Sequence, residues 1–210
     1  MKYDTWKYLY PPRPKNVITH DILPLYEARG WTAQIKKNGT NSIIAVAPDK
    51  TVYWRNRHAE NHKSWTCPKQ LADDLADRCP SGVWTMMVAE ILHLKTVDIK
   101  DVVYVHDLIV YQSIHLVGET FETRQRMLDF ILPTQGAAEG PNYYVLSKGL
   151  WRAKNFTKGF VSLFQGIKNP RVDEGLVLKN PKGQLKWCVK PDANSSWQVK
   201  CRYPTKNYQF

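Results

Sequence analysis

The segment from Gln34 to Asn41 contains the residues best suited to covalent chemistry. Lys36 stands at the end of an apolar strand pattern, and Gly39 follows it by three residues. An amine attacks only when it is neutral, and an ordinary lysine, with a pKa of about 10.4, is charged at pH 7. Partial burial and nearby cations favour the neutral form, and the end of a strand inside a cleft supplies both. The glycine lets the backbone approach a nucleotide closely. Taken alone, the pattern also fits a surface hairpin turn.

The elements expected around this segment are mainly strands. Strand patterns at 31–37 and 41–47 flank the turn Asn38-Gly39, and a strand at 51–55 follows a turn at 48–50. Because the helices are interspersed among hairpins, we predict an α+β fold with antiparallel sheets, not a doubly wound parallel sheet. The other expected elements are strands at 83–92, 102–111, 143–146, 175–179 and 185–190, helices at 20–29, 68–78, 118–132 and 153–165, and a loop at 136–141.

The composition points to a nucleic-acid partner. Thirty Lys and Arg against nineteen Asp and Glu give a net charge of +11. Such a balance favours polyanions, because each phosphate contact releases counterions, and eight Trp and eleven Tyr offer surfaces on which bases can stack. No run reaches the roughly 18 apolar residues that span a bilayer, and the N-terminus has no apolar signal core. We expect a cytoplasmic monomer, in the host cytoplasm if the protein is viral.

The cysteines give a weaker signal. Cys67, Cys79, Cys188 and Cys201 form no Cys-x-x-Cys pair, so we expect reduced thiols. A zinc site built from His58, His62, Cys67 and Cys79 is conceivable, but the spacings match no common ligand pattern.

Several further patterns follow the lysine in a fixed order. Acidic residues occur in the strand patterns Val88-Ala89-Glu90-Ile91-Leu92 and Glu174-Gly175-Leu176-Val177-Leu178-Lys179. An aspartate follows an aromatic strand in Tyr104-Val105-His106-Asp107-Leu108. Basic residues occur in Val52-Tyr53-Trp54-Arg55-Asn56, in Glu122-Thr123-Arg124-Gln125-Arg126 and in Lys186-Trp187-Cys188-Val189-Lys190.

Together with Lys36-Lys37-Asn38-Gly39, these patterns resemble the motifs of the covalent nucleotidyltransferase superfamily, which comprises DNA ligases, RNA ligases and mRNA capping enzymes. The resemblance spans residues 34–191 and is nearest to a minimal phage-type RNA ligase catalytic domain. It implies a ligase-type adenylation domain, with antiparallel sheets and helices around an ATP cleft. It also implies sealing of 5′-phosphate and 3′-hydroxyl ends through a lysyl-AMP intermediate, with Mg²⁺ or Mn²⁺ as the metal.

The resemblance assigns roles to the catalytic residues. Lys36 would be the nucleophile, and strand alternation favours it over Lys37. Glu90 and Glu174 would bind the metal, the ribose or both. For all these residues a plain surface or packing role is the alternative. The other implied roles are contact of Lys190 and Lys186 with the α-phosphate, and of Arg55, with Arg57 as a substitute, with ribose or a 5′-phosphate.

The adenine side of the cleft falls to the other motif residues. Gln34, Ile35 and Gly39 would line the nucleotide site, and the Gln34 amide could read the adenine amino edge. His106 stands where the family commonly has a Phe that stacks on adenine. Cys188 departs from the Lys-x-Lys pattern, and Lys186, two residues earlier on the same strand face, would substitute for the missing lysine. Candidates for nucleic-acid contact are Arg57, Arg124, Lys148, Arg152 and Lys154, with a structural ion pair as the alternative for Arg124.

The type of ligase is predicted from the ends of the sequence and from the residues that follow Gly39. Pro11, Pro12 and Pro14 predict an extended arm over 1–15, and about 20 residues follow Pro191, too few for an OB-fold barrel. We therefore expect one catalytic domain over 1–210 with no C-terminal OB domain. Gly39-Thr40-Asn41 is similar to the RNA ligase pattern, so we favour nicked or single-stranded RNA. The alternatives are a minimal DNA ligase and, from another class, a non-catalytic nucleic-acid-binding module on a ligase fold.

Overall fold

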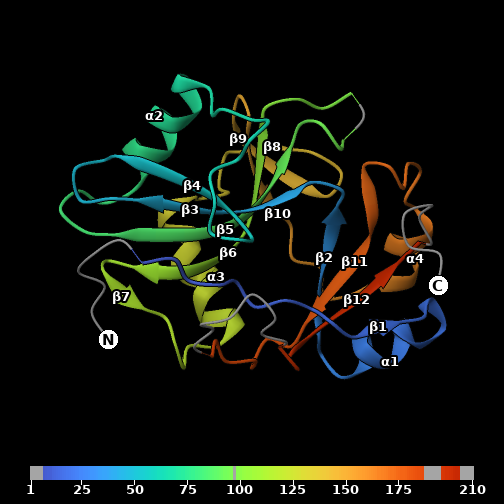
Figure 1. Cartoon of the computed structure of the whole chain (residues 1–210). Coiled ribbons are helices and arrows are strands. Elements are labelled where there is room, and N and C mark those ends of the chain that lie inside the picture. Colours follow the sequence, from blue (N-terminus) through green and yellow to red (C-terminus); the bar gives the residue numbers. More distant parts are fainter. Residues whose placement is uncertain (1–6, 97, 187–194, 204–210) are drawn as a thin grey trace.

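Two twisted β-sheets form the centre of the molecule. The computed structural model describes residues 7–96, 98–186 and 195–203. In Figure 1 the large sheet lies on the left and the small sheet on the right. The large sheet has the order β4 (Val52–Asn56), β3 (Thr40–Val46), β5 (Thr85–Leu92), β6 (Val102–Tyr111), β10 (Leu150–Ala153), β9 (Tyr143–Ser147) and β8 (Ala138–Glu139), with β7 (Ile114–His115) paired to β6. The small sheet has the order β1 (Val17–Ile18), β12 (Gln198–Arg202), β11 (Asp173–Lys179) and β2 (Thr32–Lys37).

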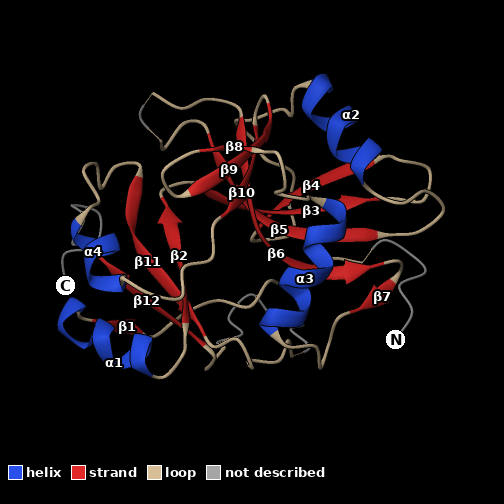
Figure 2. Ribbon diagram, turned by 180° about the vertical axis from the view of Figure 1, so that it is seen from behind, coloured by secondary structure: helices blue, strands red, loops and turns tan. Residues whose placement is uncertain are grey.

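Helices cover the sheets with their apolar sides. Leu71 and Leu75 of α2 (Lys69–Arg78) and Leu128 and Ile131 of α3 (Phe121–Ile131) are buried in the core of the large sheet. Figure 2 shows α3 lying across this sheet from behind. The spacing of four or three residues places each pair on one side of its helix. Thr120 Oγ1 caps α3 by accepting from Thr123 N at 3.1 Å.

The small sheet has its own core. α1 (Leu23–Ala28), preceded by a 3₁₀ turn at His20–Ile22, and α4 (Phe160–Gln165) pack on it. Leu23, Phe160, Ile35 and Leu176 are buried together there. Each sheet thus has an apolar core and helices of its own.

The turn at Asn38-Gly39 joins the two sheets instead of closing a hairpin. β2 pairs with β11 and β3 pairs with β4 and β5, so the predicted pairing of β2 with β3 is wrong. Gly39 is required because the chain crosses β5 closely at this point. A Cβ on Gly39 would lie 2.8 Å from Ile91 O and 3.1 Å from Glu90 Oε2.

Most predicted elements are present, with differences near the C-terminus. The predicted helix at 153–165 is only α4, because residues 150–153 join the large sheet as β10, parallel to β6. Residues 138–139 of the predicted loop form β8. Residues 185 and 186 are not in a strand, and the remainder of the strand predicted at 185–190 lies outside the described residues. Among the described residues, no helix has the length and apolar character needed to cross a membrane.

Candidate active site

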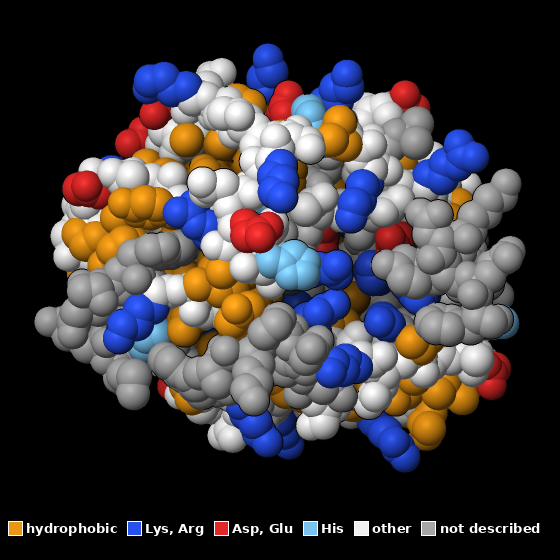
Figure 3. Space-filling view, in the orientation of Figure 1, with side chains coloured by type: hydrophobic (Ala, Val, Ile, Leu, Met, Phe, Trp, Pro, Cys, Tyr) orange, Lys and Arg blue, Asp and Glu red, His pale blue; other side chains and the backbone are white. Residues whose placement is uncertain are grey.

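A cavity of about 730 Å³ opens between the two sheets. Its walls come from strands β2, β3, β5, β6, β11 and β12, from the segment that follows β4, and from the proline-rich segment before β1. Figure 3 shows Lys and Arg side chains gathered around a hollow on this face. Cavities of this size hold ligands as large as a nucleotide.

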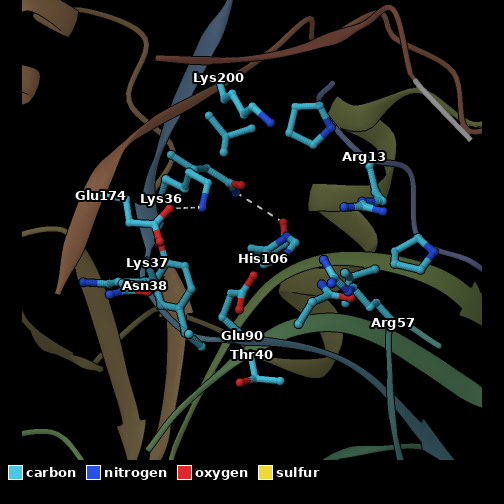
Figure 4. Close-up of a pocket in the computed structure, with 18 of the residues that line it drawn as sticks. Arg13, Lys36, Lys37, Asn38, Thr40, Arg57, Glu90, His106, Glu174 and Lys200 are labelled. Carbon is cyan, nitrogen blue, oxygen red and sulfur yellow. Dashed lines mark hydrogen bonds and ion pairs between the residues drawn. The ribbon is translucent and has the colours of Figure 1, made fainter. Parts of the chain in front are cut away.

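Lys36 and Lys37 are neighbours in β2 but have different surroundings. Lys36 Nζ forms an ion pair with Glu174 Oε2 of β11 at the cavity wall, and its side chain is 24% exposed (Figure 4). Lys37 Nζ donates to Asp173 Oδ1 at 2.7 Å and Asn142 Oδ1 at 2.9 Å, and its side chain is 1% exposed. Burial lowers the pKa of Lys37, and the charge of Asp173 opposes that shift. Alternation along β2 therefore gives Lys36 the accessible amine.

Gly175 explains why a glycine follows Glu174. Its φ is +148°, and a Cβ would lie 2.1 Å from Cys201 O and 2.6 Å from Arg202 Cα. β12 can lie against β11 only because this position has no side chain. The close pairing of the two strands brings Lys200 of β12 to the cavity.

Two buried oxygens on adjacent strands have no hydrogen-bond partner within the described part of the chain. They are Asn41 Oδ1 of β3 and Glu90 Oε2 of β5, and these residues oppose each other across the strands and line the cavity. Burial raises the pKa of Glu90 to about 7, the charge of Lys36 opposes this shift, and the charge of Glu174 adds to it. A cation or a hydrogen-bond donor from a ligand would satisfy both oxygens.

These oxygens fit a hard divalent cation. Mg²⁺ prefers carboxylate and amide oxygens and keeps several waters. The described residues contain no cluster of three or more His, Cys, Asp or Glu side chains that could hold a metal. Glu90 and Glu174 would therefore supply only part of the ligands of such an ion, and phosphate oxygens of a substrate would have to supply others. The same observation excludes a zinc site at His58, His62, Cys67 and Cys79.

A relay of three side-chain amides fixes the orientation of Gln34. It ends on His106 O, which can only accept, and Gln125 Nε2 donates to that oxygen at 3.2 Å. Gln125 Oε1 accepts from Asn155 Nδ2 at 3.0 Å, and Asn155 Oδ1 accepts from Gln34 Nε2 at 2.8 Å. Because Gln34 Nε2 also donates to His106 O at 3.3 Å, Gln34 Oε1 is the amide atom left for a ligand.

His106 and Ile35 lie beside Gln34. The His106 ring faces the cavity (Figure 4), and burial, with the charge of Lys179 adding to it, lowers its pKa to about 3. The ring is therefore neutral at pH 7 and can stack on a base. Ile35 is buried in the core of the small sheet, where its carbonyl accepts from Tyr104 Oη at 3.3 Å.

Three cations of the small sheet line the cavity although the sequence motifs did not assign them to the nucleotide site. Lys179 is 2% exposed, and burial lowers its pKa to about 8. Lys200 and Arg202 are two residues apart in β12 and lie on one side of it. Burial lowers the pKa of Lys200, and the charges of Arg202 and Lys36 add to that effect. The basic-x-basic spacing at 200–202 was the sequence signal for this pair.

Of the two lysines predicted to contact the α-phosphate, the structure describes only Lys186. Lys186 does not line the main cavity; it borders a separate, much smaller pocket with Leu9 and Tyr10. Lys190 lies outside the described residues. β12 pairs with β11, so Lys200 of β12 lines the cavity and Lys186 does not. Strand pairing depends on contacts distant in sequence, which the Lys-x-Lys pattern does not encode.

Arg57, not Arg55, reaches the cavity. Arg55 does not line the cavity; its guanidinium lies over Tyr53 at 5.9 Å and donates to Trp54 O at 3.0 Å. Arg57 follows the strand, is exposed and lines the cavity (Figure 4). Arg57, which was predicted as a substitute for Arg55, is therefore the arginine of this segment that lines the cavity.

Two of the predicted nucleic-acid contacts are buried ion pairs. Arg124 is 0% exposed and donates to both carboxylate oxygens of Asp107 at 3.0 Å. Arg152 is 3% exposed, forms an ion pair with Asp129 and donates to Leu132 O at 2.7 Å. Neither can contact a nucleic acid, because both point inward from α3 and β10 to the core.

The remaining two candidates stay on the surface. Lys148 is exposed, and Lys154 pairs with Glu139 at 2.7 Å and is half-buried. Neither lines the cavity, so any contact with nucleic acid would lie away from it.

Comparison with known proteins adds the decisive observation on the fold. The chain matches no protein-family model and no curated protein by sequence. Mycobacterial DNA ligase D, complexed with ATP and MES, is similar in structure, with a TM-score of 0.63 at 16% identity over 93% of this chain and 60% of that one. The chain has the nucleotidyltransferase fold of ATP-dependent ligases.

Other ligase structures agree. ATP-dependent DNA ligase of bacteriophage T7, in complex with ATP, has a TM-score of 0.58 at 15% identity, over 92% of this chain and 68% of that one. A Lig E DNA ligase, described as binding DNA with a minimal scaffold, has a TM-score of 0.51 at 14% identity, over 83% and 62%. The predicted fold class is confirmed, and the chain spans about 60% of the length of the mycobacterial protein.

Proposed function

We propose that this chain is an ATP-dependent polynucleotide ligase that uses Lys36 to form a covalent adenylate. The observation that carries the proposal is the position of Lys36. Its amine lies at the wall of a nucleotide-sized cavity, paired with Glu174. Lys200 and the unsatisfied oxygens of Glu90 and Asn41 line the same cavity.

The reaction follows from in-line displacement at phosphorus, which needs alignment and charge neutralisation more than acid–base chemistry. The neutral Lys36 amine attacks the α-phosphate of ATP, an N–P bond forms, the nitrogen releases one proton to water, and pyrophosphate leaves with the electrons of the broken P–O bond. AMP then passes to a 5′-phosphate, and a 3′-hydroxyl displaces it. Lys200 and Arg202 would neutralise the α-phosphate, and Glu90 and Glu174 would hold a Mg²⁺ ion that neutralises phosphate charge.

Adenine selection would depend on Gln34 and His106. Gln34 Oε1 can accept a hydrogen bond from the adenine amino group, whereas guanine offers an acceptor oxygen at that position. A neutral His106 ring can stack on the base without adding a charge to a buried site. The acceptor of Gln34 supports ATP over GTP, whereas the His106 ring would stack on either purine.

RNA is the proposed substrate, on the pattern Gly39-Thr40-Asn41 and on the position of Asn41 in the cavity beside Glu90. Nicked DNA is the second candidate, favoured by the similarity of the fold to DNA ligases. The basic surface would bind either RNA or DNA. We expect the protein to act as a monomer.

Intact mass after incubation with ATP and Mg²⁺ tests the proposal. The wild type should gain one AMP and Lys36→Ala should gain none. Lys37→Met should still gain AMP, provided that the variant is folded. Matched RNA and DNA nicks then give the substrate preference. A wild type that gains no nucleotide from ATP or GTP would leave only a binding module on a ligase fold.

A further inference from the structure

The N-terminal strap, residues 7–18, connects the two sheets along the cavity (Figure 1). At the large sheet, Leu9 is buried in the core and Tyr8 Oη donates to Asn56 O at 2.7 Å. At the small sheet, 17–18 form β1, and Lys200 N donates to Asn16 O at 3.0 Å. The strap is therefore fixed at both ends, and its middle forms part of the cavity wall.

Arg13 is the only cation in the part of the strap that lines the cavity, where its neighbours are Pro11, Pro12 and Pro14. The prolines restrict φ, so little backbone freedom is lost when the strap is held in place. Ser195 N donates to Arg13 O at 3.1 Å, which anchors the residue itself. A guanidinium on so rigid a segment is well placed to bind phosphate through paired donors.

Figure 4 places Arg13 across the cavity from Lys36 and Glu174. In an in-line displacement, the nucleophile and the leaving group lie on opposite sides of the phosphorus. If Lys36 attacks the α-phosphate, the leaving phosphates must point away from β2, to the side on which Arg13 lies. The charge of Lys200 interacts with those of both Lys36 and Arg13, a position that suits the α-phosphate itself.

We infer that Arg13 of the N-terminal strap binds the β- and γ-phosphates of ATP and stabilises the departing pyrophosphate. The inference rests on the proposed function. The reaction remains the one described above: the bond from Lys36 Nζ to the α-phosphorus forms, and the bond to the bridging oxygen breaks. The electron pair of the broken bond leaves with pyrophosphate. The Arg13 guanidinium stabilises the negative charge that pyrophosphate gains.

The experiment compares Arg13→Ala and Arg13→Lys with Arg29→Ala in the full chain. Arg29 is an exposed arginine outside the cavity, so its loss removes the same charge elsewhere. Three single-turnover quantities are measured: the rate of adenylation against ATP concentration, the pyrophosphate concentration that reverses it, and the rate at which enzyme already carrying AMP seals a nick. Thermal unfolding of each variant checks the fold.

Arg13→Ala should lower kcat/KM for adenylation at least tenfold and raise the required pyrophosphate concentration by a similar factor. Sealing by the preloaded enzyme should change by less than threefold, Arg13→Lys should be intermediate, and Arg29→Ala should match the wild type. Equal losses in adenylation and sealing would assign Arg13 to the nucleic-acid phosphate, and no loss would remove it from the site; either result overturns the inference. A wild type that does not adenylate would instead refute the proposed function, and the inference with it.

Discussion

Replacing Arg124 with alanine should destabilise the fold without removing any contact to a substrate. Arg124 is 0% exposed and its ion-pair partner Asp107 is 3% exposed. Two hydrogen bonds of 3.0 Å join them, and Arg124 Nη1 also donates to Glu119 O at 2.9 Å. The variant would leave the Asp107 carboxylate buried without its main partner, next to the buried amine of Lys179.

The size of the effect follows from this burial. Removing one partner of a buried ion pair costs about 3–5 kcal/mol, because the other charge stays desolvated. A chain of this size loses about 2–4 °C in Tm for each kcal/mol, so the expected drop is roughly 6–20 °C. Arg126→Ala, an exposed change on the same helix, should stay within about 0.5 kcal/mol of the wild type.

The pH dependence gives a second measure of the same ion pair. Burial alone would raise the pKa of Asp107, but the charges of Arg124 and Lys179 and the hydrogen bonds from Arg124 hold it below its usual value. A depressed acid pKa contributes stability above the unfolded value, and that stability is lost as the pH falls through the folded pKa. In Arg124→Ala the Asp107 carboxylate protonates more readily. The difference in free energy of unfolding between the variant and the wild type should therefore narrow below about pH 4.

Urea unfolding from pH 3 to pH 8 measures both effects, with the slope of free energy against urea expected to stay constant. If Arg124→Ala lowers the free energy of unfolding by less than about 1 kcal/mol at pH 7, or if its difference from the wild type widens in acid, this account of Arg124 is refuted.

Three further predictions concern the cavity and its surface. Because burial raises the pKa of Glu90 to about 7, the folded state binds its proton more strongly, so wild-type stability should fall as pH rises from about 4.5 to 7. Glu90→Gln should lack that slope in urea unfolding, and a wild type without it would contradict the assignment. Gly175→Ala should cost at least about 2 kcal/mol in thermal unfolding. Gly136→Ala, which also has positive φ but no atom near its Cβ, should cost about 1 kcal/mol, so equal losses would exclude the contact with β12. Affinity for a labelled RNA strand should fall at least about tenfold between 50 and 200 mM salt, as three phosphate contacts require, and a flat response would exclude electrostatic binding.

The local chemistry of the site was readable from the sequence. The spacing of Lys36 and Gly39, the Glu174-Gly175 pair and the alternation of β2 depend on neighbours within a few residues. Strand patterns and turn residues likewise predicted most helices and strands, since their signals are local. Lys37 could be set aside for the same reason, and its buried ion pair with Asp173 agrees with that choice.

The remaining features depended on which segments meet in space. Arg124 was predicted to contact nucleic acid, with a structural ion pair as the alternative, and the structure shows the ion pair, because Asp107 lies opposite it on β6 and holds it inside. The basic motif was sought at 186–190, although pairing of β12 with β11 puts Lys200 in the cavity. A single sequence carries the period of each strand but not the identity of its partner, because pairing is decided by packing between residues far apart in the chain. The positions of Lys200, Arg57 and Arg13 around Lys36 therefore emerged only from the tertiary structure.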